Sequence, residues 1–294
     1  MAAPDWVTWV ECPRDAWQGL AHAPPTALKV RHLQDLLAAG FAHLDLGSFV
    51  SRKLVPQMAD TEEVLAALGP APGADLLCII GNERGLERAA AAAGVTSVGY
   101  PLSVSDTFQR RNVGRSVQES WELVAGLLAA AGAAGLDLVV YVSMGFGNPY
   151  GDPWSPAVTA AAVARLRELG VRRLALADTL GDASAEVVRA VMAEVSDPAG
   201  LGLHLHAAPG AWSDKLEVAL AHGVRWFEGA LGGVGGCPFA ADALVGNLPT
   251  EHVLPWLAAA GLVVAPDLAA LPALARAAGE LAGVGAAGRA PLTR

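Results

Sequence analysis

The stretch Gly202-Leu203-His204-Leu205-His206 decides how the rest of this 294-residue chain is interpreted. Successive side chains of a β-strand point to opposite faces, so the two leucines share one face and the two histidines share the other. Ala207-Ala208-Pro209-Gly210 follows at once and ends the strand, which puts the histidine pair at its C-terminal end. Two imidazoles on one strand face can bind a single metal ion, although they can equally be hydrogen-bonded or solvated.

Outward from this stretch, short apolar segments alternate with helical patterns along the whole chain. Strands are predicted at 6–12, 41–46, 74–80, 96–100, 136–142, 173–177, 202–206 and 224–228. Helices are predicted at 26–40, 60–68, 85–93, 116–131, 155–170, 183–195 and 212–222. This order predicts an α/β fold, a (β/α)8 TIM barrel, in a single domain over 1–294. The barrel is expected over about 6–248, with extra C-terminal helices near 252–260 and 268–281 in an extension over about 249–294. A doubly wound open sheet is the alternative.

Composition narrows the class of partner. The chain is 53% hydrophobic and 17% charged, with a net charge of −9 and no lysine or arginine cluster, which argues against nucleic-acid binding. An anionic small molecule remains compatible with this balance. Three widely spaced cysteines suggest a reducing compartment, and the first residues lack the pattern of a secretion signal. The alanine-rich runs are too short to span a bilayer, so we expect a cytoplasmic protein with no membrane contact.

Polar residues gather where the predicted strands end. Because all strand C-termini of a barrel meet at one face, these side chains are expected to converge there. They are Arg14, Asp15, Asp45, Ser48, Asn82, Asp178, Thr179, His204, His206 and Glu228. Asp15 with two neutral histidines offers one oxygen and two nitrogen ligands, a set that suits Mg²⁺, Mn²⁺, Co²⁺ or Zn²⁺. Each carboxylate alone could be a loop cap or a salt bridge, and it is their convergence that favours a site.

The segment Gly232-Gly233-Val234-Gly235-Gly236-Cys237-Pro238 is the second informative stretch. So many glycines indicate mobility or close approach of the backbone to a ligand, and Cys237 is expected to be accessible in at least one state. An ordinary flexible loop with an incidental thiol is the alternative. The stretch lacks the Gly-Lys-Ser/Thr of a phosphate-binding loop and the strand context of a dinucleotide fingerprint.

Taken in order, the motifs of this chain resemble the 3-hydroxy-3-methylglutaryl-CoA lyase family. That family belongs to the metal-dependent lyase and synthase barrels that include isopropylmalate and citramalate synthases. The matching motifs are Val10-Glu11-Cys12-Pro13-Arg14-Asp15, Ser48-Phe49-Val50-Ser51, Val55-Pro56-Gln57-Met58, Ser105 to Asn112, Tyr141-Val142-Ser143, Asp178-Thr179-Leu180-Gly181, His204-Leu205-His206 and Gly232 through Asn247. The loop Gly235 to Ala240 and the later Gly246-Asn247 favour the lyase branch over the condensing synthases.

The resemblance implies a role for each matching residue. Asp15, His204, His206 and Asn247 would bind one divalent cation, Mg²⁺ or Mn²⁺. Arg14 would stabilise the enolate oxygen, His204 would also carry a proton, and Cys237 would lie on a loop that closes over the substrate. Substrate contacts would come from Gln18, Asp45, Ser48, Asn82 and Thr179. The implied reaction cleaves hydroxymethylglutaryl-CoA, or a related 3-hydroxyacyl-CoA, to acetyl-CoA and an oxo acid, and a homodimer is expected by analogy.

Some residues beside these motifs depart from the family pattern. Ala16-Trp17-Gln18-Gly19-Leu20 stands where the lyases have Gly-Leu-Gln-Asn-Glu, and Asp45 stands where they have Glu. Ala207-Ala208-Pro209-Gly210 replaces Asp-Thr-Tyr-Gly, and losing an acid that supports a metal ligand commonly costs about 10–100-fold in metal affinity or activity. Two alternatives therefore stay open: a lyase or condensing synthase for a different acyl-CoA, and a non-catalytic barrel that binds metal or acyl-CoA.

Overall fold

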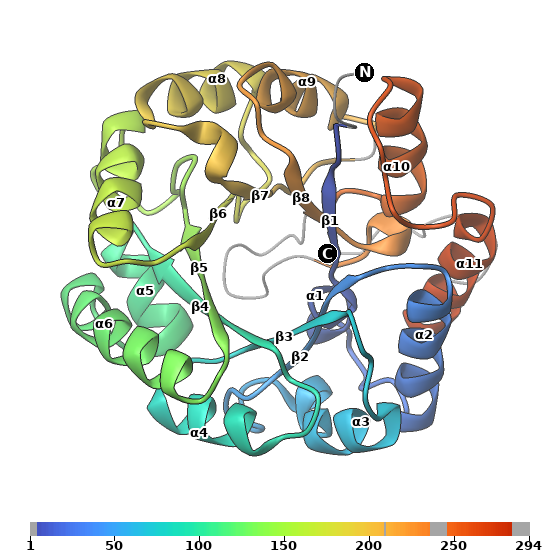
Figure 1. The fold of residues 1–294 in the computed structure, drawn as a ribbon. Helices are drawn as coiled ribbons and strands as arrows, with labels where there is room; N and C mark the ends of the chain where they lie inside the picture. Colours follow the sequence, from blue (N-terminus) through green and yellow to red (C-terminus); the bar gives the residue numbers. More distant parts are fainter. Residues whose placement is uncertain (1–4, 209, 236–245, 284–294) are drawn as a thin grey trace.

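The computed structural model describes residues 5–208, 210–235 and 246–283. Its centre is a closed barrel of eight parallel strands hydrogen-bonded in sequence order, with β8 pairing back onto β1 (Figure 1). The strands are β1 (Thr8–Glu11), β2 (His43–Ser48), β3 (Asp75–Ile79), β4 (Ser97–Ser103), β5 (Asp137–Ser143), β6 (Arg173–Ala177), β7 (Gly202–His204) and β8 (Trp226–Gly229). The predicted (β/α)8 barrel is therefore confirmed, and the open-sheet alternative is wrong.

Helices form a ring around the strands (Figure 1). They are α1 (Pro13–Gln18), α2 (Thr26–Ala38), α3 (Thr61–Leu68), α4 (Glu83–Ala91), α5 (Asp106–Val113), α6 (Val117–Ala133), α7 (Pro156–Glu168), α8 (Ala185–Glu194), α9 (Ser213–Ala221), α10 (Thr250–Ala259) and α11 (Leu271–Leu281). Single 3₁₀ turns lie at η1 (Pro56–Met58), η2 (Pro198–Gly200) and η3 (Leu231–Gly233). Because α10 is the helix that follows β8, it completes the ring, and α11 packs beyond it against α2.

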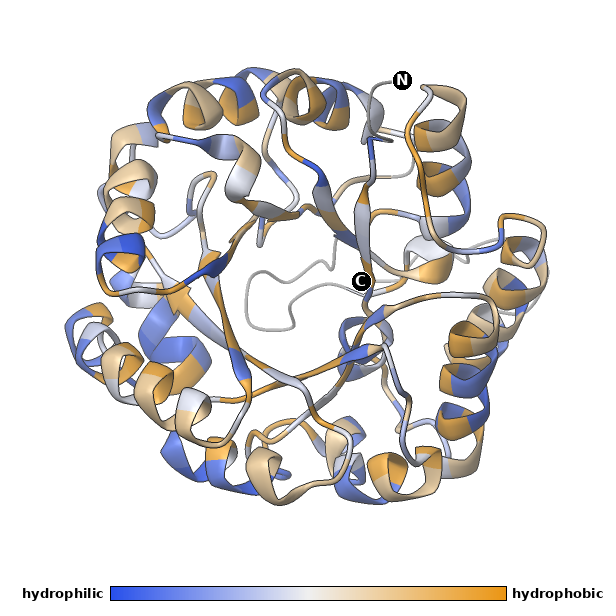
Figure 2. Cartoon of the chain, in the orientation of Figure 1, coloured by the Kyte–Doolittle hydropathy of each residue, from blue (hydrophilic) through white to orange (hydrophobic). Residues whose placement is uncertain are grey.

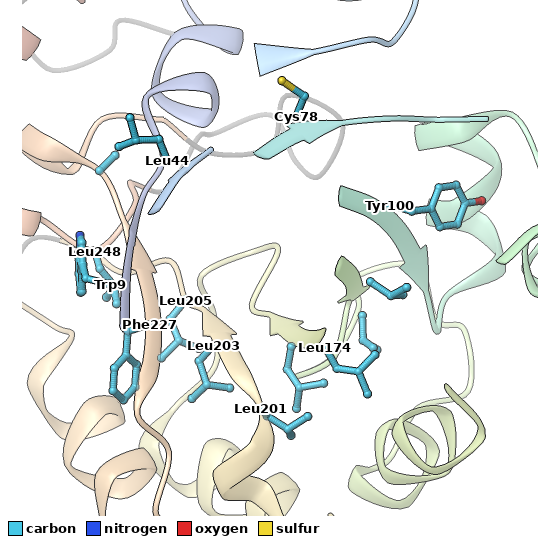
Figure 3. Close-up of a cluster of buried hydrophobic side chains, with 14 of the residues drawn as sticks. Trp9, Leu44, Cys78, Tyr100, Leu174, Leu201, Leu203, Leu205, Phe227 and Leu248 are labelled. Carbon is cyan, nitrogen blue, oxygen red and sulfur yellow. The ribbon is translucent and has the colours of Figure 1, made fainter. Parts of the chain in front are cut away.

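Two apolar layers hold the barrel together. Leu203 and Phe227 on the strands, and Leu205 just after β7, point outward into the large core between strands and helices (Figure 3). The intervening residues point inward, where a smaller cluster fills the barrel interior. Each outer helix carries hydrophobic and hydrophilic residues together, as helices with one face on a sheet require (Figure 2). The expected alternation of Leu203 and Leu205 against His204 is therefore observed.

Gly202 shows why the strand of the histidine pair begins with glycine. A Cβ atom built at Gly202 would lie only 2.5 Å from the Trp226 ring on the neighbouring strand β8. The Trp226 ring fills the interior at this level, and the Arg173 guanidinium lies 5.5 Å from its centroid. The absence of a side chain at Gly202 thus makes room for the Trp226 ring at the N-terminal end of the barrel strands.

One strand boundary differs from the prediction at a proline. The strand expected to end at Tyr100 continues through Pro101 to Ser103. Pairing between β3 and β4 ends at Ile79 and Gly99, whereas pairing between β4 and β5 continues to Ser103. The Pro101 nitrogen faces the side that β3 has already left, because the neighbouring Ser103 N–H on that side bonds the Gln109 side chain instead. Proline is tolerated in a strand where no partner needs its N–H.

Other boundaries also differ. The segment after β1, expected to be a strand exit, is the first turn of α1, with Pro13 at the helix start where its missing N–H costs nothing. Helix α5 was not expected; the Ser105 side chain caps it. The strand that begins at Gly202 ends at His204, and His206 forms an isolated antiparallel bridge with Asn247.

No helix within the described ranges is long and apolar enough to cross a lipid bilayer.

Candidate active site

A pocket opens at the C-terminal ends of the strands, where the sequence predicted convergence. Seven of the predicted site residues line it: Arg14, Asp15, Gln18, Ser48, Thr179, His204 and His206. Its lining also includes the apolar side chains of Val50, Ile80 and Phe108. Charged groups together with hydrocarbon suit a ligand with a polar head and a long, weakly polar arm.

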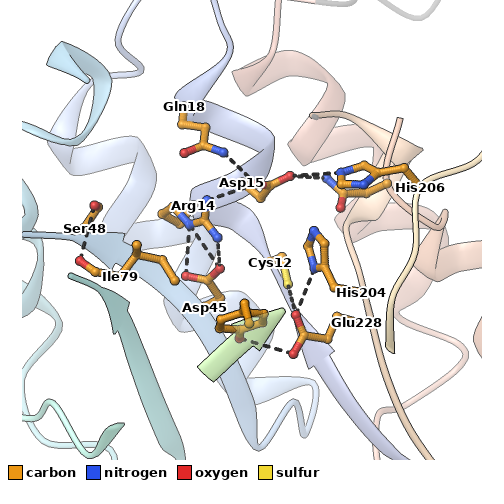
Figure 4. A network of polar contacts seen from close by, with 12 residues as sticks. Cys12, Arg14, Asp15, Gln18, Asp45, Ser48, Ile79, His204, His206 and Glu228 are labelled. Atoms are coloured by element: carbon orange, nitrogen blue, oxygen red, sulfur yellow. Dashed lines mark hydrogen bonds and ion pairs between the residues drawn. The ribbon is translucent and has the colours of Figure 1, made fainter. Parts of the chain in front are cut away.

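Arg14 lies at the base of the pocket between two carboxylates (Figure 4). Its Nε donates to both Asp45 oxygens at 3.0 and 3.1 Å, its Nη2 donates to Asp45, and its Nη1 donates to Asp15 Oδ1 at 2.9 Å. Burial lowers the pKa of Arg14, but Asp45 and Asp15 outweigh this and raise it above its usual value. The guanidinium is therefore permanently charged and fixed in orientation, with N–H groups left for a ligand.

His204 is oriented by an acid from the neighbouring strand. Its Nδ1 contacts Glu228 Oε2 at 2.9 Å, and the other Glu228 oxygen accepts a hydrogen bond from the Tyr141 hydroxyl at 3.2 Å. Burial lowers the pKa of His204, but the hydrogen bond and charge of Glu228 raise it overall. The bond to Nδ1 leaves Nε2 facing the pocket (Figure 4). Burial also raises the pKa of the nearby Cys12 well above its usual value, so this thiol stays protonated.

His206 and Asn247 bring two buried atoms without a hydrogen-bond partner to the same place. His206 donates from Nδ1 to the Asp178 carbonyl at 2.8 Å, and its Nε2 lies 3.7 Å from Asp15 Oδ2. Asn247 Nδ2 donates to that Asp15 oxygen at 2.8 Å and to the Val234 carbonyl at 2.9 Å. Within the described residues, His206 Nε2 and Asn247 Oδ1 are two of five buried side-chain atoms without a hydrogen-bond partner.

These atoms fit a divalent cation. Asp15, His204 and His206 each offer one ligand atom, and these atoms lie within 4.8 Å of one another. Burial raises the pKa of Asp15, but Arg14 and the two histidines outweigh it and hold that pKa well below its usual range. The Asp15 carboxylate is thus ionised and could supply an oxygen ligand, and a cation would give the two unpartnered atoms beside it a partner.

Three of the predicted residues that the structure describes do not line the pocket: Asp45, Asn82 and Asn247, of which Asn247 bonds the pocket residue Asp15. Asp45 lies behind Arg14, fully buried, and holds that side chain instead of facing a ligand. Asn82 caps α4, its Oδ1 accepting from Gly85 N at 2.9 Å, and lines a separate groove. An asparagine at a strand end has both uses, and here the helix start that follows it takes the side chain. Cys237 lies outside the described residues.

The site also contains residues to which the sequence assigned no role. Glu228 was recognised as a strand-end acid, but its contact with His204 joins neighbouring strands and has no signal in spacing. Tyr141, within a matching motif, reaches the same acid from β5, three strands away in the barrel. Lys215, on α9, is buried and bonds Asp178 at 2.9 Å. A lysine in the first turn of a helix normally reads as a surface residue, so only the fold reveals it.

Comparisons with known proteins identify the family that this chain resembles. The HMGL-like family model matches residues 7–277. A mitochondrial hydroxymethylglutaryl-CoA lyase of Mus musculus is 37% identical over 254 residues, covering 85% of this chain and 77% of the relative. A 3-hydroxy-3-isohexenylglutaryl-CoA/hydroxymethylglutaryl-CoA lyase of Pseudomonas aeruginosa is 34% identical, covering 86% of this chain and 85% of the relative.

Solved structures extend the likeness to the fold. The structure of a hydroxymethylglutaryl-CoA lyase from Acinetobacter baumannii in complex with coenzyme A and 3-methylmalate has a TM-score of 0.88 and 30% identity. The matched region covers 100% of this chain and 99% of the chain in that structure. The family predicted from the motifs and the predicted carbon–carbon lyase class are both confirmed by these likenesses. The chain belongs to the HMGL-like family.

Proposed function

We propose that this lyase cleaves hydroxymethylglutaryl-CoA, or a closely related 3-hydroxyacyl-CoA, between C2 and C3, releasing acetyl-CoA and an oxo acid. The observation that carries the proposal is the fixed Arg14 guanidinium in one pocket with Asp15, His204 and His206, where Asn247 is hydrogen-bonded to Asp15. A cation and an oriented guanidinium are the two charges that this cleavage needs. The names of the relatives support the substrate class.

The reaction requires the C3 hydroxyl to lose its proton and the C2–C3 electron pair to move to C2. That pair is delocalised onto the thioester oxygen, so the oxygen gains negative charge as the bond breaks. We assign Arg14 to this oxygen, because its guanidinium is held rigidly by Asp45 and Asp15 and needs no rearrangement to stabilise the charge. A divalent cation, when bound, acts as a Lewis acid toward the substrate oxygens.

A proton must leave the C3 hydroxyl and one must be returned to C2. His204 is the proposed proton carrier, because Glu228 fixes Nδ1 and supports a positive charge on the ring. Its Nε2 faces the pocket, so this nitrogen is the one that would exchange the proton or hold the cation. Gln18, whose Nε2 donates to Asp15 Oδ1 at 2.6 Å, keeps that carboxylate in place during the exchange.

The surroundings of the pocket support an acyl-CoA. A second groove shares Val50 with the mouth of the pocket and is lined by Arg52, Lys53, Arg84 and Arg88. Glu62 pairs with Arg52 and Arg88, while Lys53 and Arg84 are exposed. An apolar channel leading to a cationic groove matches an acyl group on a pantetheine arm that ends in phosphates.

The finer assignments are also proposals. Mg²⁺ or Mn²⁺ is the favoured cation, because two oxygen ligands stand beside two imidazoles and the nearby thiol of Cys12 stays protonated. A cytoplasmic location is supported by Cys12 and Cys78, which are buried and unpaired. A homodimer follows from family analogy, and the molar mass in solution measures it.

The test is acetyl-CoA release from hydroxymethylglutaryl-CoA by protein stripped with EDTA, before and after Mg²⁺ or Mn²⁺ is added. We expect release to require the cation and to follow its binding at one ion per chain. Cleavage of a homologue with a larger 3-substituent, but not of hydroxymethylglutaryl-CoA, would favour the alternative of a lyase for a different acyl-CoA. The name of the Pseudomonas aeruginosa relative suggests such a substrate. A protein that binds the cation and cleaves neither substrate would overturn the lyase proposal.

A further inference from the structure

Lys215 is a buried cation that the proposed chemistry does not use. Its side chain is 8% exposed, although it lies in the first turn of α9, on the outer ring of the barrel. An ammonium has three N–H donors, and Lys215 has three acceptors: Asp178 Oδ2 at 2.9 Å, the His206 carbonyl at 2.9 Å and the Gly181 carbonyl at 3.3 Å. A buried charge so fully satisfied is costly to assemble and is rarely incidental.

Two of the acceptors of Lys215 are directly connected with His206. Lys215 bonds the carbonyl of His206 itself, and it bonds the side chain of Asp178, whose carbonyl accepts the His206 Nδ1–H at 2.8 Å. The same Asp178 joins its neighbour strand through its N–H, which donates to the His204 carbonyl at 2.9 Å. Lys215 therefore ties together the main chain of His206 and the group that orients its ring.

His206 needs such support because the barrel does not supply it. Strand β7 ends at His204, so the ladder of parallel strands does not fix His206. On one side it is held by the bridge to Asn247 and by the bond from Ala207 N to the Gly246 carbonyl. The residues that follow, Ala207-Ala208-Pro209-Gly210, offer no polar side chain for the other side.

We propose that Lys215, together with Asp178, is the positioning residue for His206 and thereby sets how tightly the pocket holds its cation. Lys215 does not touch the substrate or the cation. Its charge is balanced by Asp178, so it holds His206 without adding a net charge beside the ligands. This inference rests on the proposed cation site, but its geometry can be measured without any cation.

The first experiment measures cation affinity directly. EDTA-stripped wild-type protein and Lys215→Met are titrated with Mn²⁺, and free Mn²⁺ is followed by electron paramagnetic resonance. We expect Lys215→Met to bind Mn²⁺ about 10–100-fold more weakly, the range typical for lost supports of metal ligands. Lys215→Arg, which keeps the charge and several donors, should recover most of the affinity. Unchanged Mn²⁺ affinity in Lys215→Met would overturn the inference.

Lys29→Met is the matched control, since it also removes a buried lysine that is paired with an aspartate and a carbonyl. Lys29 Nζ bonds Asp60 Oδ1 at 2.6 Å and the Gln57 carbonyl at 2.5 Å, away from His206. It should lose stability but keep Mn²⁺ affinity; an equal loss of affinity would mean that Lys215 acts only through general stability. If Lys215→Met does not fold, the double variant Lys215→Met/Asp178→Asn is titrated in its place, because it also removes the Asp178 charge that Lys215→Met leaves unpaired.

The second measurement needs no cation and separates this inference from the proposed function. The Nδ1–H of His206, bonded to the Asp178 carbonyl, should be protected from exchange and visible by NMR in protein with ¹⁵N-labelled histidine. We expect Lys215→Met to lose that signal and Lys29→Met to keep it. A wild-type protein that binds no Mn²⁺ would overturn the cation site and the proposed function, whereas a retained signal in Lys215→Met would overturn the positioning role.

Discussion

The two ends of the barrel each hold an arginine–aspartate pair, and they differ in what surrounds it. At the C-terminal end, Arg14 bonds Asp45 from β2; at the N-terminal end, Arg173 of β6 bonds Asp75 of β3 at 2.6 Å. Arg173 also lies 3.8 Å from Asp137, whose other oxygen is 3.9 Å from Arg172. Charges at the N-terminal end are therefore balanced in number.

The C-terminal end is arranged differently. Arg14 lies between the buried carboxylates of Asp15 and Asp45, and the buried Glu228 contacts His204 and raises its pKa. Two buried atoms beside Asp15, His206 Nε2 and Asn247 Oδ1, have no hydrogen-bond partner. A buried polar atom without a partner is costly, and a ligand in the adjoining pocket would supply one. The comparison shows that an arginine–aspartate pair is enclosed by other ion pairs at one end of the barrel and lies beside unpartnered polar atoms at the other.

The largest expected effect separates the two arginines by activity. Arg14→Lys keeps the positive charge but loses the planar set of donors that two carboxylates hold in place. We expect its rate of acetyl-CoA release to fall by about 10²–10³-fold, as for the loss of one fixed donor to a developing oxyanion. Arg173→Lys is the matched change at the other end and should stay within about twofold. Equal losses in the two variants would remove the distinction between the ends.

A smaller effect separates them by stability. Arg173→Met leaves Asp75 without its bond to the guanidinium, so the free energy of unfolding should fall by about 1–3 kcal/mol, measured by urea denaturation. Asp75 keeps its contacts to Ser97, Thr96 and His43, which limits the loss. The Mn²⁺ affinity of the folded variant should not change. A loss of Mn²⁺ affinity would show that the two ends are coupled.

The smallest expected effect is on thermal stability at acidic pH. Burial raises the pKa of Asp75, but hydrogen bonds from His43 and Arg173 outweigh it, so this pKa lies well below its usual range. The folded-state pKa is thus lower than the unfolded one, and the stability from Asp75 is present above about pH 4 and is lost as the pH falls through the folded-state pKa. Asp75→Asn should therefore lose less of its thermal stability than wild type between pH 5 and pH 3. Parallel melting curves for both proteins over that range would contradict this account.

Much of the fold followed from local patterns. Apolar segments of strand length separated by amphipathic helices predicted eight strands in the order observed, because burial on both faces leaves a readable run of hydrophobic residues. The predicted strand ends were wrong where pairing with a residue distant in the sequence sets the end of the strand. Pro101 stays in β4 because β3 has ended beside it, and His206 leaves β7 because Asn247 pairs with it.

From the sequence alone, alternation and strand order predicted Asp15 after the first strand and His204 and His206 at the end of the seventh as candidate cation ligands. The resemblance to the family added Asn247 to this predicted set. The contacts of Asp45 with Arg14, of Glu228 with His204 and of Lys215 with His206, and the helix cap formed by Asn82, are visible only in the folded chain. Apart from the helix cap, these contacts join different elements of the barrel, and its closure sets their distances, which no spacing along the chain encodes.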